Sequence, residues 1–93
     1  MARPGWQPCT IVWTRPAVSE MHKLAARNPQ LASRILSAVE RYAETGLGDL
    51  QRLRGQAGSR LRVGTWRVIF DLDTTAREVI ITTVGPRRDV YRE

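Results

Sequence analysis

Cysteine, histidine and lysine each occur once in this 93-residue sequence, as Cys9, His22 and Lys23. A single cysteine excludes a disulfide within the chain and is typical of proteins in a reducing cytosol. One cysteine and one histidine are too few for a Cys/His zinc site or for Cys–His nucleophilic catalysis. The sequence also has no glycine-rich loop of the Walker or dinucleotide-binding kind. We therefore expect neither a metal nor a cofactor.

Long hydrophobic runs are missing as well. The apolar stretches are a few residues long, whereas roughly 20 apolar residues are needed to cross a bilayer. The first eight residues lack the apolar centre of an export signal and are predicted to form a short flexible tail. Residues 9–93 suffice for one modest core, so we expect a single domain in a cytoplasmic protein without a membrane partner.

Positive charge is what the sequence has in excess. Lysine and arginine number 15 against 9 acidic residues, which gives a net charge of +6, and all but one of these cations are arginines. The planar guanidinium group suits phosphate and stacks on bases, so this bias favours a nucleic-acid partner. A genome-wide preference for arginine codons would produce the same composition, and the positions of the arginines must decide.

A strand and two helices are expected in the first half of the chain. The β-branched and aromatic residues 9–13 favour a strand, after which Thr14 is predicted to cap a helix that begins near Pro16. Asn28 ends this helix and caps the next one, which stops near Gly46. Two amphipathic helices separated by so short a break predict an antiparallel hairpin.

Strands dominate the second half. Residues 59–63, 66–72 and 77–84 are predicted strands, residues 50–53 form a weaker candidate, and Gly64-Thr65 fits a two-residue turn. The order of strand, two helices and further strands predicts an α+β domain. In this domain the helical hairpin packs on one face of a mostly antiparallel sheet of about four strands.

Arginines gather around the predicted turn. Between residues 51 and 67 there are five arginines and no acid. A turn at Gly64-Thr65 places Arg62 opposite Arg67, and Arg60 shares their face because side chains alternate along a strand. The apolar residues fall on the other face, against the helices: Leu61, Val63, Trp66, Val68 and Phe70. Opposed like charges cost up to about 1 kcal/mol, so this cluster favours a phosphate-binding site over a solvated polar face.

The end of the chain adds to this cluster. After the Gly85-Pro86 pair there follow Arg87, Arg88, Tyr91 and Arg92. A tyrosine among arginines can stack on a base while the cations hold the backbone.

Three stretches together resemble one family of proteins. Residues 53–55 (LRG), 60–70 (RLRVGTWRVIF) and 84–92 (VGPRRDVYR) are similar to the RelE/ParE superfamily of toxins. The resemblance extends to the strand and two helices that precede them. It implies the toxin component of a type II toxin–antitoxin system, in particular a RelE-like, metal-independent endonuclease that cuts messenger RNA on the ribosome and inhibits translation.

The resemblance also implies functional residues and partners. The catalytic positions would be Arg60, Arg62, Arg67, Arg87 and Tyr91. The further RNA-binding positions would be Arg52, Arg54, Arg88 and Arg92. A cognate antitoxin would neutralise the toxin, and the complex would bind operator DNA through the antitoxin. Two alternatives remain open, namely a ParE-like inhibitor of DNA gyrase that is not an enzyme, and a basic nucleic-acid-binding module without catalysis.

Overall fold

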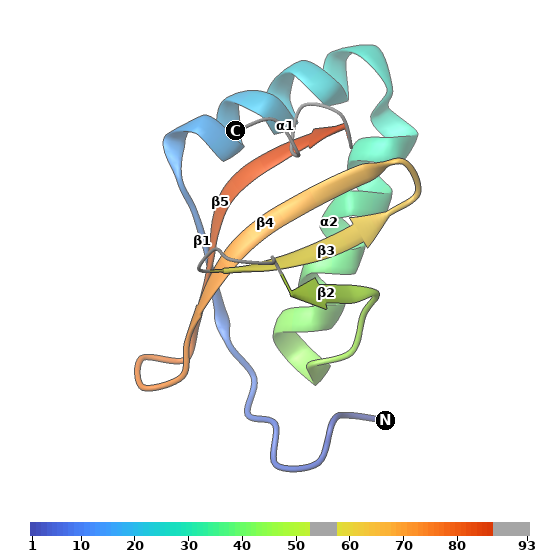
Figure 1. Cartoon of the computed structure of the whole chain (residues 1–93). Coiled ribbons are helices and arrows are strands. Elements are labelled where there is room, and N and C mark those ends of the chain that lie inside the picture. The colour runs from blue at the N-terminus through green and yellow to red at the C-terminus, as the bar shows by residue number, and fades with distance from the viewer. Residues whose placement is uncertain (53–57, 87–93) are drawn as a thin grey trace.

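The structure is a computed structural model that describes residues 1–52 and 58–86. Five strands form one sheet in the order β1-β5-β4-β3-β2, and two helices pack against it (Figure 1). In chain order the elements are β1 (Thr10–Trp13), α1 (Arg15–Arg27), α2 (Pro29–Thr45), β2 (Leu50–Arg52), β3 (Ser59–Val63), β4 (Trp66–Asp73) and β5 (Glu78–Pro86). The predicted α+β class is confirmed. The sheet has five strands because the weak candidate β2 pairs with β3.

The ends of the two helices show how local sequence sets their limits. The side chain of Asn28 accepts a hydrogen bond from the backbone N–H of Leu31 at 3.1 Å, as predicted for the cap of α2. Gly46 ends α2 in the left-handed conformation, with φ 75°. The predicted Thr14 side-chain cap is wrong, although α1 does begin at the next residue. The Thr14 hydroxyl instead donates to the carbonyl of Ile81 at 2.8 Å and ties the start of α1 to β5.

The pairing of the strands agrees with the predicted turn. Gly64 has φ 61°, which suits a glycine in a tight hairpin turn. Across it Val63 pairs with Trp66 and Arg62 with Arg67. Among the described strands, the pairs β2–β3, β3–β4 and β4–β5 are antiparallel, and β1–β5 is parallel. The β3–β4 hairpin therefore has a fixed register, which determines the face on which each arginine lies.

The core lies between the sheet and the helices. In Figure 1 α2 runs behind the strands and α1 along their upper ends. Buried residues of the helices, such as Ile35, Val39 and Tyr42, meet the apolar residues of the sheet. The sheet contributes the fully buried residues Leu61, Val68, Phe70, Val79 and Ile81. We call this side of the sheet the helix-covered face. No helix in the described ranges is long and apolar enough to cross a bilayer.

The segment before β1 contacts the end of α2. The indole N–H of Trp6 donates to the carbonyl of Ala43 at 3.0 Å, and its ring lies 5.2 Å from that of Tyr42 between centroids. The backbone N–H of Arg3 donates to the carbonyl of Thr45 at 2.8 Å. Residues 1–8 contain no helix or strand. The flexibility expected for them stays a prediction, and these contacts are where it can be tested.

Candidate nucleic-acid interface

The β3–β4 hairpin brings three of the predicted catalytic residues together. Arg62 and Arg67 are direct partners across the two strands, and Arg60 lies two residues along β3 opposite Ile69. All three belong to the side of the sheet away from the helices, because their neighbours Leu61 and Val68 are buried against the core. We call the surface formed by Arg60, Arg62 and Arg67 the basic face.

The three arginines differ in their access to solvent. Arg60 is 8% exposed and Arg67 is 3% exposed, whereas the side chain of Arg62 is 45% exposed. Of these three arginines, Arg62 is therefore the one whose side chain extends into water. A guanidinium withheld from water attracts an anion more strongly than a hydrated one, because the local dielectric is lower. Burial also means that an anion reaches Arg60 and Arg67 only if this surface rearranges.

Arg67 is folded back toward the hairpin turn. Its Nη1 donates to the carbonyl of Trp66 at 3.0 Å and to that of Gly64 at 3.3 Å. Its Nε is buried and has no hydrogen-bond partner among the residues that the structure describes. An unused buried donor on a cation is costly unless something else accepts its hydrogen bond. Arg67 therefore both stabilises the turn and retains a donor for an anionic ligand.

Two residues in and just before the short strand β2 bind arginines of the basic face. Gln51 of β2 is the cross-strand partner of Arg60 and accepts a hydrogen bond from the Nη2 of that arginine. Asp49, just before β2, forms an ion pair with Arg62, with 2.6 Å between Oδ2 and Nε. The sequence reasoning missed both partners. In an antiparallel pairing of β2 with β3, residues 49 and 51 face residues 62 and 60. This pairing, if assumed from the sequence, would have identified both partners.

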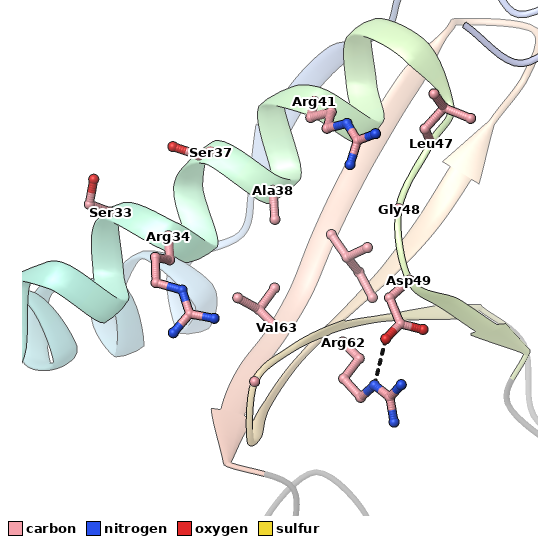
Figure 2. A pocket seen from close by; sticks show the side chains of 12 residues that line it. Ser33, Arg34, Ser37, Ala38, Arg41, Leu47, Gly48, Asp49, Arg62 and Val63 are labelled. Carbon is pink, nitrogen blue, oxygen red and sulfur yellow. Dashed lines mark hydrogen bonds and ion pairs between the residues drawn. The ribbon is translucent and has the colours of Figure 1, made fainter. Parts of the chain in front are cut away.

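A groove of about 450 Å³ opens beside the basic face, between α2, the segment that leads into β2, and the end of β3 (Figure 2). Arg34 and Arg41 extend from α2 toward it, and Arg62 with Asp49 lies on its opposite side. The apolar residues Leu61 and Val63 of β3 also line it. The sequence reasoning did not single out Arg34 or Arg41. Their spacing of seven residues on a predicted helix, which puts both on one side, was the available signal.

Several predicted site residues cannot be placed. Arg54, Arg87, Arg88, Tyr91 and Arg92 lie outside the described residues. Arg52 lies in β2, but the description of this residue is limited to its backbone. Three of the nine predicted positions, Arg60, Arg62 and Arg67, are therefore brought together by the structure.

Other chemistries find little support in the part of the chain that is described. No group of three or more histidine, cysteine, aspartate or glutamate side chains there could hold a metal ion. Burial raises the pKa of the Cys9 thiol, and nearby Arg77 opposes this shift only in part. The thiol of Cys9 is therefore protonated at neutral pH and a weak nucleophile. The groups that this surface offers for binding or catalysis are therefore its guanidinium groups.

Comparison with known proteins gives the family. The sequence model described as "ParE toxin of type II toxin-antitoxin system, parDE" matches residues 11–91. The chain belongs to the RelE/ParE superfamily of toxins. Toxin RelG of Mycobacterium tuberculosis (strain ATCC 25618 / H37Rv) is 33% identical over 95 residues, which cover 91% of this chain and 98% of the relative.

Solved structures agree with this membership. The toxin–antitoxin complex RelBE2 of Mycobacterium tuberculosis contains a chain that is 28% identical, with a TM-score of 0.61 over 87% of this chain and 100% of that one. The archaeal RelE–RelB complex of Pyrococcus horikoshii OT3 shares the fold at 18% identity, with a TM-score of 0.70 over 87% and 97% of the two chains. The chain is thus a RelE/ParE toxin of the type II toxin–antitoxin class.

Proposed function

We propose that this toxin is a metal-independent, ribosome-dependent endonuclease of messenger RNA that inhibits translation. The observation that carries the proposal is the basic face, on which Arg62 and Arg67 oppose each other and Arg60 lies beside them. Three guanidinium groups on one β-hairpin suit a phosphate whose negative charge grows in the transition state. RNA contact with Arg60 and Arg67 requires their burial to be relieved on binding.

The proposed reaction needs no metal. The 2′-hydroxyl oxygen of the RNA attacks the adjacent 3′-phosphate, and the bond from phosphorus to the 5′-oxygen breaks. The attack leaves a 2′,3′-cyclic phosphate, the proton of the 2′-hydroxyl passes to water, and the departing 5′-oxygen takes a proton from water to give a 5′-hydroxyl end. Arg62, Arg67 and Arg87 hold the phosphate in this proposal, with Arg60 beside them. Tyr91 stacks on or orients a base, or exchanges a proton.

The proposal also includes further RNA-binding residues and the protein partners of the toxin. Arg52, Arg54, Arg88 and Arg92 hold the RNA backbone, and the ribosome positions the message. A cognate antitoxin neutralises the toxin, and the complex binds operator DNA through the antitoxin. Support for the antitoxin comes from the two similar solved structures, both of which are toxin–antitoxin complexes.

Single-turnover cleavage of ribosome-bound message tests the proposal. We expect Arg67→Ala to slow cleavage by about 100-fold or more, the loss found when one transition-state donor is removed. Arg27→Ala at the exposed end of α1 is the control for lost positive charge and should cleave like the parent. An Arg67→Ala protein that is folded and as fast as the parent would exclude the phosphate-binding role of this residue.

A second candidate is inhibition of DNA gyrase without catalysis. One observation favours it, since the family model that matches the chain is described as ParE. Supercoiling assays with purified gyrase, beside primer extension on message from cells in which the toxin is induced, separate the two. Growth arrest with new cleavage sites inside translated regions supports the endonuclease. Arrest with gyrase inhibited and the message intact supports the alternative, and no arrest leaves a basic binding module.

A further inference from the structure

A second groove, separate from the one beside α2, opens between α1 and the end of β5. Strand β1 pairs with β5 only as far as Ile81. Residues 83–86 of β5 therefore pair with β4 on one side and with no strand of the described ranges on the other. Helix α1 passes beside this open edge (Figure 1), and we call the resulting groove of about 350 Å³ the α1–β5 groove. It is lined by Pro16, Ser19 and Glu20 of α1 and by residues 82–85 of β5.

The α1–β5 groove begins one strand away from the basic face. Gly85 lines the groove and is also the cross-strand partner of Arg67. Partners in an antiparallel sheet have Cα atoms about 5 Å apart, and Gly85 has no side chain to separate Arg67 from a ligand in the groove. Arg67 also keeps a buried Nε donor that no described residue uses. A nucleotide with its phosphate on Arg67 can therefore reach the groove with its base.

The polar side chains of the α1–β5 groove are one carboxylate and several hydroxyls. None of the described residues that line it is a lysine or an arginine, so the groove does not favour a phosphate. The hydroxyl of Thr82 is used within the sheet, where it donates to the carbonyl of Ile69 at 3.2 Å. The Glu20 carboxylate lies 3.7 Å from the ammonium group of Lys23, and this ion pair is weak because both side chains are exposed. Glu20 therefore keeps the capacity to accept hydrogen bonds from a ligand.

A carboxylate distinguishes between the four bases of RNA. On the Watson–Crick edge of guanine two donors, N1–H and the 2-amino group, lie side by side and match the two carboxylate oxygens. On adenine and cytosine the amino group is next to a ring nitrogen whose lone pair is repelled by a carboxylate. Uracil has a single N–H between two carbonyl groups. Guanine is therefore the base that Glu20 can bind through two hydrogen bonds.

We propose that the α1–β5 groove binds a guanine base of the message, with Glu20 accepting hydrogen bonds from its N1–H and 2-amino groups while Arg67 holds the adjacent phosphate. The identification of the ligand as message rests on the proposed function, whereas the preference of the groove for guanine does not. Glu20 is thus a specificity-determining residue on α1, outside the basic face. The toxin should cleave message next to guanosine.

Short oligonucleotides test this preference on the full chain without the ribosome. The probes are labelled oligouridines that differ only at the central position, which is guanosine, inosine or adenosine. Inosine keeps the N1–H of guanosine but lacks its 2-amino group, so it can make one of the two hydrogen bonds. Fluorescence anisotropy measures the binding of each probe to the parent, to Glu20→Gln and to Glu40→Gln. Glu40 is exposed on α2 and does not line the groove, so its variant has the same change in net charge and keeps the Glu20 carboxylate.

We expect the parent and Glu40→Gln to bind the guanosine probe at least about 10-fold more tightly than the adenosine probe, with inosine between them, as for a bidentate contact to a base. In Glu20→Gln this ratio should fall to about threefold or less. Equal affinities for guanosine and adenosine in the parent, a ratio unchanged in Glu20→Gln, or an equal fall in Glu40→Gln would overturn the proposal. If the parent cleaves no message but shows the expected ratios, the endonuclease proposal fails and the groove proposal stands. If it cleaves message and prefers guanosine in neither assay, the groove proposal fails and the endonuclease proposal stands.

Discussion

The two faces of the β3–β4 hairpin present opposite chemistry one residue apart. On the helix-covered face Leu61 and Val68 are 2% and 0% exposed and are paired with each other across the strands. On the basic face the adjacent pair is Arg62 and Arg67. The helix-covered face is stabilised by the burial of apolar surface, to which any apolar residue of suitable shape contributes. The second depends on particular partners, because each guanidinium must find acceptors or an anion. Substitutions should therefore affect the two faces in different ways.

The helix-covered face should give the largest loss of stability. Phe70 is 1% exposed, and its ring lies 4.8 Å from that of Tyr42 between centroids. Phe70→Ala leaves a cavity and should lower the free energy of unfolding by about 3–5 kcal/mol. Urea denaturation followed by circular dichroism measures the loss. Leu36→Ala on the exposed side of α2 is the control and should cost about 0.5 kcal/mol. Similar losses in both would mean that Phe70 is not part of a packed core.

The helix-covered face was also the easier one to predict from sequence. Alternation along residues 59–63 and the turn at Gly64 were enough to give the register and the faces of Leu61 and Val68. The same reasoning placed Arg62 opposite Arg67 but said nothing of their exposure. Burial depends on what covers a residue from elsewhere in the chain, and local periodicity carries no information about that.

Partners from distant segments account for the other differences. The Thr14 hydroxyl was expected to cap α1, but β5 offers the carbonyl of Ile81 at 2.8 Å and takes that hydrogen bond. Asp49 escaped notice because it falls just outside the acid-free stretch of sequence, and only the pairing of β2 with β3 brings it to Arg62. Thr14 and Ile81 are far apart in the sequence, and Asp49 lies just before a strand that the sequence predicts only weakly.

A smaller loss of stability is expected from a substitution in the segment before β1, which packs against the end of α2. Trp6 contacts Tyr42 and donates to the carbonyl of Ala43. Trp6→Ala removes the ring and this hydrogen bond and should lower the free energy of unfolding by about 2 kcal/mol, since the side chain is only half-buried. Amide exchange at residues 1–8 should rise in the variant. Thermal unfolding of Gln7→Ala, next to Trp6 and exposed, is the control. An unchanged stability in Trp6→Ala would favour a tail that is free of the body.

Alkaline pH should lower the free energy of unfolding through Tyr42, which packs against the helix-covered face. Burial raises the pKa of Tyr42, with a further increase from Cys9 and an opposing effect of Arg3. The unfolded chain therefore loses this proton near the ordinary tyrosine value of about 10, while the folded chain still holds it. Stability is retained below that pH and falls above it, by at most about 1.4 kcal/mol per pH unit for one proton. Urea unfolding between pH 8 and 11 should show a flatter profile for Tyr42→Phe than for the parent. Identical slopes would exclude Tyr42 as the responsible group.

The basic face should show the reverse pattern, with little change in stability and a clear change in ligand binding. The Asp49–Arg62 ion pair is about half exposed on both sides, and such pairs contribute between 0 and about 1 kcal/mol. Asp49→Asn should therefore leave the midpoint of urea unfolding nearly unchanged. It frees Arg62 for phosphate, so the affinity for single-stranded RNA should rise, and the slope of log K against log salt should steepen by about 0.7.

Glu40→Gln is the matched control for this change. It removes one negative charge from the exposed surface of α2, away from the basic face, and should leave the salt slope unaltered. A steeper slope in both variants would assign the effect to net charge. A large drop in stability in Asp49→Asn would show that the basic face, like the helix-covered one, is built first for folding.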